Sequence, residues 1–263
     1  MKIRIIKKHN LEDTHYMKKF YEYLKLRDIE IVYKTEECDL IVTFGGDGTI
    51  LEAAQAVLVK DVPILAVNMG SLGYLACIRD SEAIYILEKF LENDYKIEKR
   101  NFLKINYNGD YHYALNELVI AKGGIKSSLI EISVYAESEL INKYRADGII
   151  VATPTGSTAY SLSAGGPIVH PALNSILLTP LSPQSLTTRA VVLDGDKMLS
   201  FNLESRENDI HLNIDGKTHF KIHKQDKIET KLSRKGIRLI KSESRDYFQI
   251  LREKLKWGDS FKI

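Results

Sequence analysis

The run from Leu40 to Phe44 most constrains the fold, because it is almost wholly apolar and ends in a glycine-rich turn. A strand of this composition is typical of a parallel sheet that is covered on both faces by helices. The turn is Gly45-Gly46-Asp47-Gly48-Thr49, and a helix-like stretch follows it from Ile50 to Leu58. A buried strand, a tight turn and a helix in this order predict an α/β unit.

The first hundred residues repeat this alternation of strand and helix. Asn10 or Asp13 is the candidate N-cap of the first helix. The alternation predicts a doubly wound parallel sheet, with residues 1–96 as an N-terminal α/β domain. The expected strands lie at 3–6, 29–33 and 62–67, besides 40–44, and the expected helices at 17–24 and 83–91, besides 50–58.

Beyond residue 96 the pattern changes to short alternating runs that are separated by turn dipeptides. Asn108-Gly109, Asp194-Gly195 and Asp215-Gly216 each predict a hairpin. We therefore expect residues 97–240 to form an all-β domain, a β-sandwich in the interpretation given below. Tyr247, Phe248, Leu251 and Leu255 restore a helical period, and we expect this last helix to return to the first domain, which assigns residues 241–263 to it.

The composition argues against several classes of protein. Apolar residues make up 44% of the 263, which is enough for the core of one large domain or two smaller ones. The net charge of +2 gives no reason to expect a nucleic-acid or anionic-membrane partner. The two cysteines, Cys38 and Cys77, fit a reducing compartment. No run resembles a signal peptide or a membrane span, so we expect a cytoplasmic location.

The glycine turn predicts a phosphate site. Glycines permit positive φ and a close backbone approach, and the start of a helix presents unpaired N–H groups. Asp47 needs a separate explanation, because a phosphate repels a carboxylate. It could accept a proton from an attacking hydroxyl or hold Mg²⁺, or it could merely shape the turn and cap the helix. The turn lacks the third glycine of the dinucleotide-binding fingerprint.

Three later segments carry polar residues where a core would not place them. Gly70-Ser71-Leu72-Gly73-Tyr74 follows a strand and could line the same crevice or be an ordinary loop. Asn116-Glu117 interrupts an apolar run, and its burial is costly unless a ligand or the neighbouring backbone binds it. Residues 153–167 are rich in glycine and small hydroxyl side chains, which suits a loop around a polar ligand with Tyr160 as a stacking ring. A purely structural loop is the alternative.

Two other patterns do not indicate a site. Gly216-Lys217-Thr218 resembles the end of a Walker A loop, but His211 occupies the position of the earlier glycine, so a hairpin is the better interpretation. His211, His219 and His223 lie on expected strands without ligand spacing, so we predict hydrogen-bonded or exposed histidines and no metal site.

Taken in order, these segments resemble the NAD kinase family, whose members phosphorylate NAD to NADP. The resemblance implies an N-terminal α/β domain and a C-terminal β-sandwich, with the chain end returning to the first domain and the site between them. It covers most of the chain and rests on Gly45 to Thr49, Asn116-Glu117, Asp147-Gly148, Thr153 to Tyr160, and Gly165-Gly166-Pro167.

The resemblance implies transfer of a phosphoryl group from ATP, or from inorganic polyphosphate, to the adenosine ribose 2′-hydroxyl of NAD. Asp47 would orient and deprotonate that hydroxyl, and Mg²⁺ or another divalent cation would arrive with the donor phosphates. The implied phosphate-binding residues are Gly45, Gly46, Gly48 and Thr49. The implied NAD-binding residues are Gly46, Asp47, Gly48, Tyr74, Asn116, Glu117, Arg145, Asp147, Thr155, Thr158, Ala159, Tyr160 and Ser163.

Within that set the resemblance gives some residues a specific role. Asn116 and Glu117 would hold the adenosine end, Tyr74 would pack on the ligand, and the adenine would lie among Thr158, Ala159 and Tyr160. Members of the family are homo-oligomers in which Asp147 reaches a neighbour's nicotinamide end, so a homodimer or homotetramer with a shared site is expected. The departures from the family are Ser71, Gln184 and Lys217, which concern donor preference and affinity rather than the reaction.

Several functions stay open at this point. Lipid kinases of the diacylglycerol and sphingosine type, and sugar kinases such as phosphofructokinases, share the Gly-Gly-Asp-Gly pattern, but we expect none to combine it with Asn116-Glu117 and residues 153–167. A non-catalytic dinucleotide sensor would keep the loops and lose Asp47. The choices between NAD and NADH, ATP and polyphosphate, and dimer and tetramer also stay open.

Overall fold

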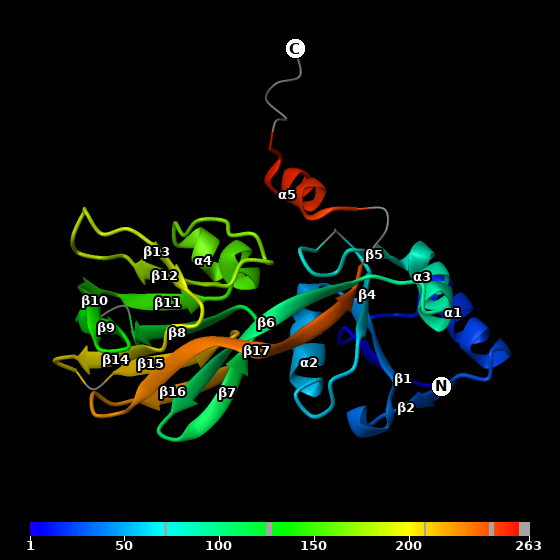
Figure 1. Ribbon diagram of the computed structural model, residues 1–263, viewed down its shortest axis with the longest axis horizontal. Coiled ribbons are helices and arrows are strands. Elements are labelled where there is room, and N and C mark those ends of the chain that lie inside the picture. Colours follow the sequence, from blue (N-terminus) through cyan, green and yellow to red (C-terminus); the bar gives the residue numbers. More distant parts are fainter. Residues whose placement is uncertain (71–72, 125–127, 208, 242–244, 258–263) are drawn as a thin grey trace, which may run out of the picture. The chain divides into compact units, whose positions relative to one another are not determined.

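The computed structural model describes residues 1–70, 73–124, 128–207, 209–241 and 245–257 (Figure 1). The chain divides into two compact units, Met1–Lys99 with Ile237–Ile263, and Arg100–Gly236. Of the predicted C-terminal segment 241–263, residues 242–244 and 258–263 lie outside the described residues. Among the described helices, none is long and apolar enough to cross a membrane.

The first unit is built on a parallel sheet whose strands lie in the order β17-β4-β3-β1-β2, with β5 also paired to β4. The strands are β1 (Lys2–Lys7), β2 (Glu30–Val32), β3 (Leu40–Gly45), β4 (Ile64–Asn68), β5 (Ile78–Arg79) and the end of β17 (Ile228–Ile240). The helices are α1 (His15–Leu26), α2 (Asp47–Ala56), α3 (Ala83–Leu91) and α5 (Tyr247–Leu255), with 3₁₀ turns at Thr35–Glu37 and Asp80–Glu82.

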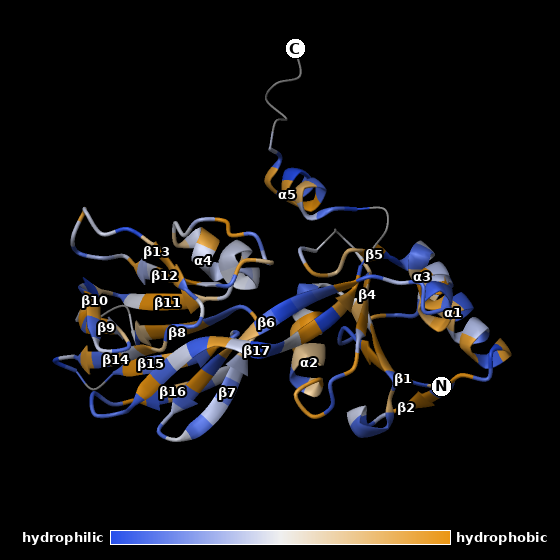
Figure 2. Ribbon diagram, viewed as in Figure 1, coloured by the Kyte–Doolittle hydropathy of each residue, from blue (hydrophilic) through white to orange (hydrophobic). Residues whose placement is uncertain are grey.

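Helices cover both faces of this sheet, as the apolar run of β3 predicts. Leu40, Val42 and Phe44 alternate along β3 and pack against the buried residues of α1 and α3. Helix α2 lies on the opposite face (Figure 1), and the sheet strands carry mostly hydrophobic residues (Figure 2). The doubly wound arrangement is therefore confirmed.

The start of α1 differs from the prediction. Thr14 is the N-cap, and its hydroxyl oxygen accepts the backbone N–H of Met17 at 3.3 Å. Asp13 instead binds the ammonium of Lys7 at 2.9 Å, and Asn10 adopts a left-handed backbone with a φ of 57°. The choice of Asn10 or Asp13 as the cap was wrong, because both residues are engaged elsewhere in the preceding turn.

The second unit consists of two antiparallel sheets, in the orders β10-β9-β14-β17-β6-β7 and β13-β12-β11-β8-β15-β16. Its helical segments are a 3₁₀ turn at Thr155–Thr158 and the short helix α4 (Tyr160–Ser163). The strands are β6 (Ile97–Tyr107), β7 (Asp110–Ala114), β8 (Glu117–Lys122), β9 (Ile130–Ala136), β10 (Glu139–Ala146), β11 (Gly148–Ala152), β12 (Ser175–Leu181), β13 (Val191–Asp194), β14 (Leu199–Glu204), β15 (Ile210–Ile214), β16 (Thr218–Ile222) and β17.

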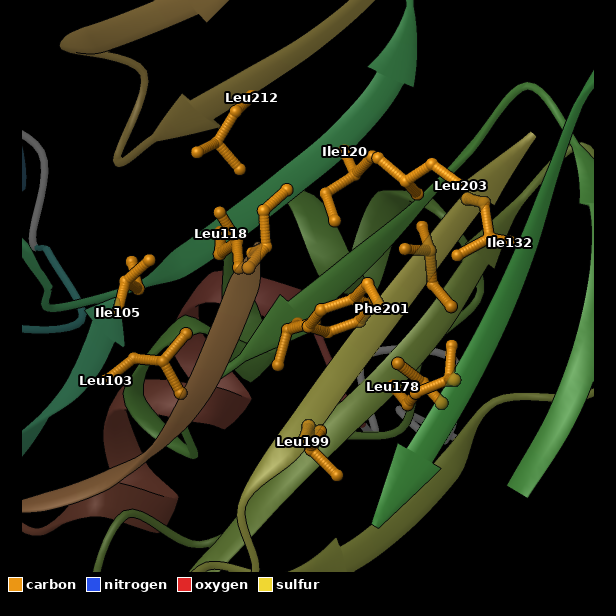
Figure 3. Packing of buried hydrophobic residues seen from close by; sticks show 14 of the residues in the cluster. Leu103, Ile105, Leu118, Ile120, Ile132, Leu178, Leu199, Phe201, Leu203 and Leu212 are labelled. Atoms are coloured by element: carbon orange, nitrogen blue, oxygen red, sulfur yellow. The ribbon is translucent and has the colours of Figure 1, made fainter. Parts of the chain in front are cut away.

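Apolar side chains from both sheets form one buried cluster, so the predicted β-sandwich is confirmed. Leu103 of β6, Leu118 of β8 and Phe201 of β14 belong to it and are almost fully buried (Figure 3). Strand β11 is buried on both faces, because Ile149 points into this cluster while Ile150 belongs to a smaller one.

Two of the three predicted hairpins form. Asn108-Gly109 and Asp215-Gly216 have positive φ at both residues, as a type I′ turn requires, and they join paired strands. The Asp194-Gly195 prediction was wrong. Strand β13 pairs with β12, and β14 pairs with β9 and β17, so this dipeptide leads from one sheet to the other. Gly195 is closely packed there, since a Cβ would lie 2.7 Å from the Asn174 Oδ1.

Candidate active site

The glycine turn connects strand β3 to helix α2 in the first unit. Gly45 is the last residue of β3, Gly46 is the N-cap and Asp47 is the first residue of α2. A Cβ on Gly45 would lie 2.0 Å from the Thr49 Oγ1, so close packing requires a glycine at this position. Positive φ, which the sequence also suggested, is not found at Gly45, Gly46 or Gly48.

Gly46 and Gly48 lie beside open space. Apart from chain neighbours and the backbone of α2 itself, a Cβ built on either residue meets no atom of the described residues within 4 Å, and neither has a positive φ. The packing of the described chain and the backbone conformation therefore do not explain why these residues are glycines. The space lies at the start of α2, where backbone N–H groups lack helical partners and favour an anion.

The Asp47 carboxylate accepts hydrogen bonds from three successive backbone N–H groups. Tyr74 donates to Oδ2 at 2.9 Å, while Leu75 and Ala76 donate to Oδ1 at 3.0 and 3.1 Å. These bonds occupy both lone pairs of Oδ1 and leave one on Oδ2. Asp47 is half-buried, so Oδ2 is the oxygen that can still accept a proton from another molecule.

Gly73, which the sequence indicated only as part of the segment from Gly70 to Tyr74, lies against the Asp47 carboxylate. A Cβ at this position would lie 2.1 Å from the Asp47 Oδ1, so the carboxylate can take its place only beside a glycine. The spacing of Gly70 and Gly73 after β4 was the available signal. Ser71 and Leu72, which belong to the same predicted segment, lie outside the described residues.

Tyr74 follows this glycine and is half-buried. Burial and the nearby charge of Asp47 raise the pKa of its hydroxyl above the usual value of 10.0. The ammonium of Lys254, on α5, lies 5.9 Å from the centre of the Tyr74 ring, within the range of a cation–π contact. One face of the ring is therefore next to helix α5.

Asn116 and Glu117 lie where strand β8 begins in the second unit. Glu117 is 8% exposed, and its Oε2 has no hydrogen-bond partner among the described residues. Burial, then the charge of Asp215, raises the pKa of Glu117 from 4.5 to about 7, although the Tyr160 N–H bonds to the carboxylate and opposes the shift. An orphaned polar atom of this kind indicates a missing partner such as a ligand.

The loop that follows β11 packs against Asn116. A Cβ on Gly156 would lie 2.2 Å from the Asn116 backbone oxygen, and the Thr153 N–H donates to that oxygen at 2.8 Å. The structure thus brings together Asn116, Glu117 and the residues from Thr155 to Tyr160.

Several hydroxyls of this loop form hydrogen bonds with neighbouring protein groups. Ser157 Oγ bonds the Pro154 oxygen at 2.7 Å and the Val169 backbone, and Ser161 bonds Thr179 at 2.9 Å. For these residues the structural interpretation holds. Four predicted residues differ in exposure: Thr155 is buried, Thr158 and Ala159 are half-buried and Ser163 is exposed. The Tyr160 side chain is 48% exposed and is available for stacking.

Arg145 and Asp147 lie at the other end of β11 from Thr153. Five residues of extended strand separate them from that end by about 15 Å. The Asp147 carboxylate forms an ion pair with the Lys122 ammonium at 2.7 Å. Arg145 is exposed and lines a hollow of about 520 Å³ with Ser128, Leu129, Glu131, Glu204, Ser205 and Arg206. The structure therefore does not group these two residues with Asn116 and Glu117.

The described part of the chain contains no cluster of three or more His, Cys, Asp or Glu side chains that could hold a metal ion. His211 bonds Asp209 through Nε2 at 2.9 Å and His219 through Nδ1 at 2.8 Å, so these histidines are hydrogen-bonded as predicted. The one carboxylate of the glycine turn, Asp47, has a single spare lone pair on Oδ2, which does not make a dedicated cation site.

Comparison with known proteins identifies the family. A model of the ATP-NAD kinase N-terminal domain matches residues 4–95, and a model of the ATP-NAD kinase C-terminal domain matches residues 115–242. The NAD kinase of Fusobacterium nucleatum is 38% identical over 264 residues, which cover 99% of both chains. The NAD kinase of Geotalea daltonii is 40% identical over 229 residues, covering 85% of this chain and 80% of the relative.

Two solved structures share the fold of this chain. Yeast NADH kinase complexed with NADH superposes with a TM-score of 0.89 at 25% identity, covering 100% of this chain and 89% of the yeast chain. An NAD kinase from Archaeoglobus fulgidus in complex with ATP gives 0.79 at 26% identity, covering 97% and 99%. These matches favour an NAD kinase over the lipid and sugar kinases that share the glycine turn, and with both domain models present in order the chain belongs to the NAD kinase family.

Proposed function

We propose that this NAD kinase transfers the terminal phosphoryl group of ATP to the adenosine ribose 2′-hydroxyl of NAD, giving NADP, with Asp47 as the general base. The observation that carries the proposal is the Asp47 carboxylate, which three backbone N–H groups fix in place while one lone pair of Oδ2 stays free. A base for phosphoryl transfer needs this combination of a fixed position and an available acceptor.

In the proposed step the 2′-hydroxyl oxygen attacks the terminal phosphorus of ATP. The hydroxyl proton passes to Asp47 Oδ2, the new O–P bond forms and the bond to the ADP oxygen breaks. The phosphates occupy the open space beside Gly46 and Gly48, where the N–H groups at the start of α2 bind them. Gly45 and Thr49 support the turn. A divalent cation such as Mg²⁺, arriving with the donor, would neutralise charge on the transferred group.

The second unit supplies most of the proposed contacts to NAD. Asn116 and Glu117 bind the adenosine ribose, and the orphaned Glu117 Oε2 supports this role because it needs a partner. Tyr160 stacks on the adenine, beside Thr158 and Ala159, and its exposed ring supports that role. The remaining proposed NAD contacts are Tyr74, Arg145, Asp147, Thr155 and Ser163.

Asp147 lies at the opposite end of β11 from the loop residues. We propose a homodimer or homotetramer in which Asp147 reaches a neighbour's NAD, as the resemblance to the family implies. The yeast and Archaeoglobus relatives hold NADH and ATP respectively, which supports nucleotides of these types as acceptor and donor here. An assay that crosses NAD and NADH with ATP and polyphosphate would identify the preferred pair.

Replacing the proposed base tests the mechanism. Asp47→Asn keeps the size of the side chain but removes the proton acceptor, so NADP formation should fall by about 10² to 10⁴-fold. NAD binding, measured by calorimetry, should stay within a few-fold of the wild type. Asp80→Asn, in the same unit but outside the glycine turn, serves as the control and should keep full activity. An Asp47→Asn enzyme with normal turnover would show that Asp47 is not the base.

A further inference from the structure

The backbone from Leu115 to Glu117 is bound at every hydrogen-bonding group. Its three N–H groups all donate to the Asp215 carboxylate, at 2.6 Å from Leu115, 2.8 Å from Asn116 and 3.0 Å from Glu117. On the carbonyl side, the Thr153 hydroxyl donates to Leu115 O at 2.6 Å and the Thr153 N–H to Asn116 O at 2.8 Å. The Asp215 N–H donates to Glu117 O at 3.0 Å.

Asp215 is an unusual turn residue. It opens the turn between β15 and β16, where either Asp or Asn before glycine satisfies the left-handed backbone. Side chains in such turns normally point into solvent, but Asp215 is only 7% exposed. The turn alone thus explains neither its burial nor the need for a carboxylate.

We propose that Asp215 is a positioning residue for NAD binding, which fixes the backbone of Leu115 to Glu117 and thereby aims the side chains of Asn116 and Glu117. The inference rests on the proposed function, which assigns those two side chains to NAD. Three N–H groups that converge on one carboxylate form charge-assisted hydrogen bonds, which are stronger than neutral ones. The segment is therefore ordered before NAD arrives, and binding does not have to order it.

Asp215 also acts on Glu117 through its charge. The two carboxylates are neighbours inside the protein, and the charge of Asp215 contributes, after burial, to the raised pKa of Glu117. Burial raises the pKa of Asp215 itself, while the three N–H groups and the charge of Lys217 act to lower it. Removing the Asp215 charge should consequently lower the pKa of Glu117, an effect that a purely structural residue would not have.

The test compares Asp215→Asn with wild type in NAD kinase assays. The variant keeps a residue that suits the turn, but its amide nitrogen cannot accept an N–H, so part of the Leu115–Glu117 backbone loses its partner. The KM for NAD should rise on the order of tenfold or more, which matches the loss of one charged hydrogen bond. The KM for ATP should stay within about threefold. The pH dependence of the KM for NAD should shift to lower pH.

Three further variants make the test decisive. Asp226→Asn, a turn carboxylate of the same unit that accepts the His223 N–H at 2.8 Å, should leave both KM values unchanged. Thr153→Val removes the hydroxyl that holds the carbonyl side and should also raise the KM for NAD. Thr153→Ser restores that hydroxyl and should bring the KM back toward wild type. If Asp215→Asn does not fold, the Thr153 pair decides the question.

Two outcomes would overturn the inference: a folded Asp215→Asn enzyme with unchanged KM for NAD and unchanged pH dependence, or equal rises in the KM for NAD and for ATP. Asn116→Ala separates this failure from failure of the proposed function. If Asn116→Ala raises the KM for NAD while Asp215→Asn does not, NAD binding by Asn116 stands and positioning by Asp215 is wrong. If neither variant changes that KM, the proposed role of Asn116 itself is wrong.

Discussion

Two aspartates in this chain hold backbone segments in the same way. Asp47 binds the N–H groups of Tyr74, Leu75 and Ala76, and Asp215 binds those of Leu115, Asn116 and Glu117. Each carboxylate fixes a short segment that carries proposed ligand contacts. Each carboxylate keeps one lone pair on Oδ2, and the difference lies in exposure, because Asp47 is half-buried while Asp215 is only 7% exposed. Only Asp47 can therefore act on a substrate.

The titration of Glu117 gives a prediction about stability. Its pKa is about 7 in the folded chain against 4.5 for the free group, so between these values the folded protein holds a proton that the unfolded chain has released. The free energy of unfolding therefore falls as pH rises through this window, by up to about 3 kcal/mol at pH 8. Glu117→Gln is neutral at every pH and should lose this dependence.

Urea denaturation at pH 4.5 and pH 8 measures the effect. The stability of Glu117→Gln relative to wild type should increase between the two pH values. Glu139→Gln, an exposed site on β10, should show no such increase. Parallel curves for Glu117→Gln and wild type would mean that Glu117 ionises normally in the folded protein.

At the scale of the elements, two glycines of the glycine turn have different roles, one in packing and the other in ligand binding. A Cβ on Gly45 overlaps the Thr49 side chain, whereas a Cβ on Gly46 meets no atom within 4 Å in the part of the chain that the structure describes. Gly45→Ala should therefore lower the melting temperature by several degrees, in line with about 1–3 kcal/mol of overpacking. Gly46→Ala should keep the melting temperature and raise the KM for ATP. The reverse result, with Gly46→Ala unstable and fully active, would contradict a phosphate site in that space.

Much of the element pattern is predictable from the sequence. Helix α3 has the predicted bounds, and the buried strand β3 and the helix α5 lie where apolar periodicity places them. The failures were local. Asp194-Gly195 has the residue types of a hairpin, but its glycine packs against Asn174, about 20 residues earlier, which no dipeptide pattern contains.

The site was also predictable only in part, because some of its residues owe their roles to contacts with residues far away in the sequence. Asp47, Asn116 and Glu117 stand out because polar or charged residues interrupt apolar or glycine-rich runs. The roles of Gly73 and Asp215 depend on contacts with residues 26 and 100 positions away, Asp47 and Leu115. Asp215 also satisfies a turn pattern by itself, so no sequence pattern indicates its second role.

At the scale of the whole molecule, each compact unit has its own buried cluster. Leu118→Ala creates a cavity in the sandwich and should lower the stability of the second unit by about 2–5 kcal/mol. Amide hydrogen exchange should accelerate in β8 and β11, while the amides of β3 in the first unit stay protected. Leu186→Ala, at a side chain that is 90% exposed in the same unit, is the matched control and should change neither. Equal acceleration in β3 and β8 would mean that the units unfold together.

The return of the chain to its first unit has a consequence during synthesis on the ribosome. Leu239 pairs with Ile64 of β4, and Ile240 belongs to the buried cluster of the first unit. The glycine turn is synthesised early, but the edge of β4 at Ile64 stays unpaired until residues near 240 have been synthesised. This takes roughly 10–30 s longer at ordinary translation rates. The second unit emerges during that delay and can fold before the first is complete. The part of the enzyme that is translated first is therefore the part that matures last.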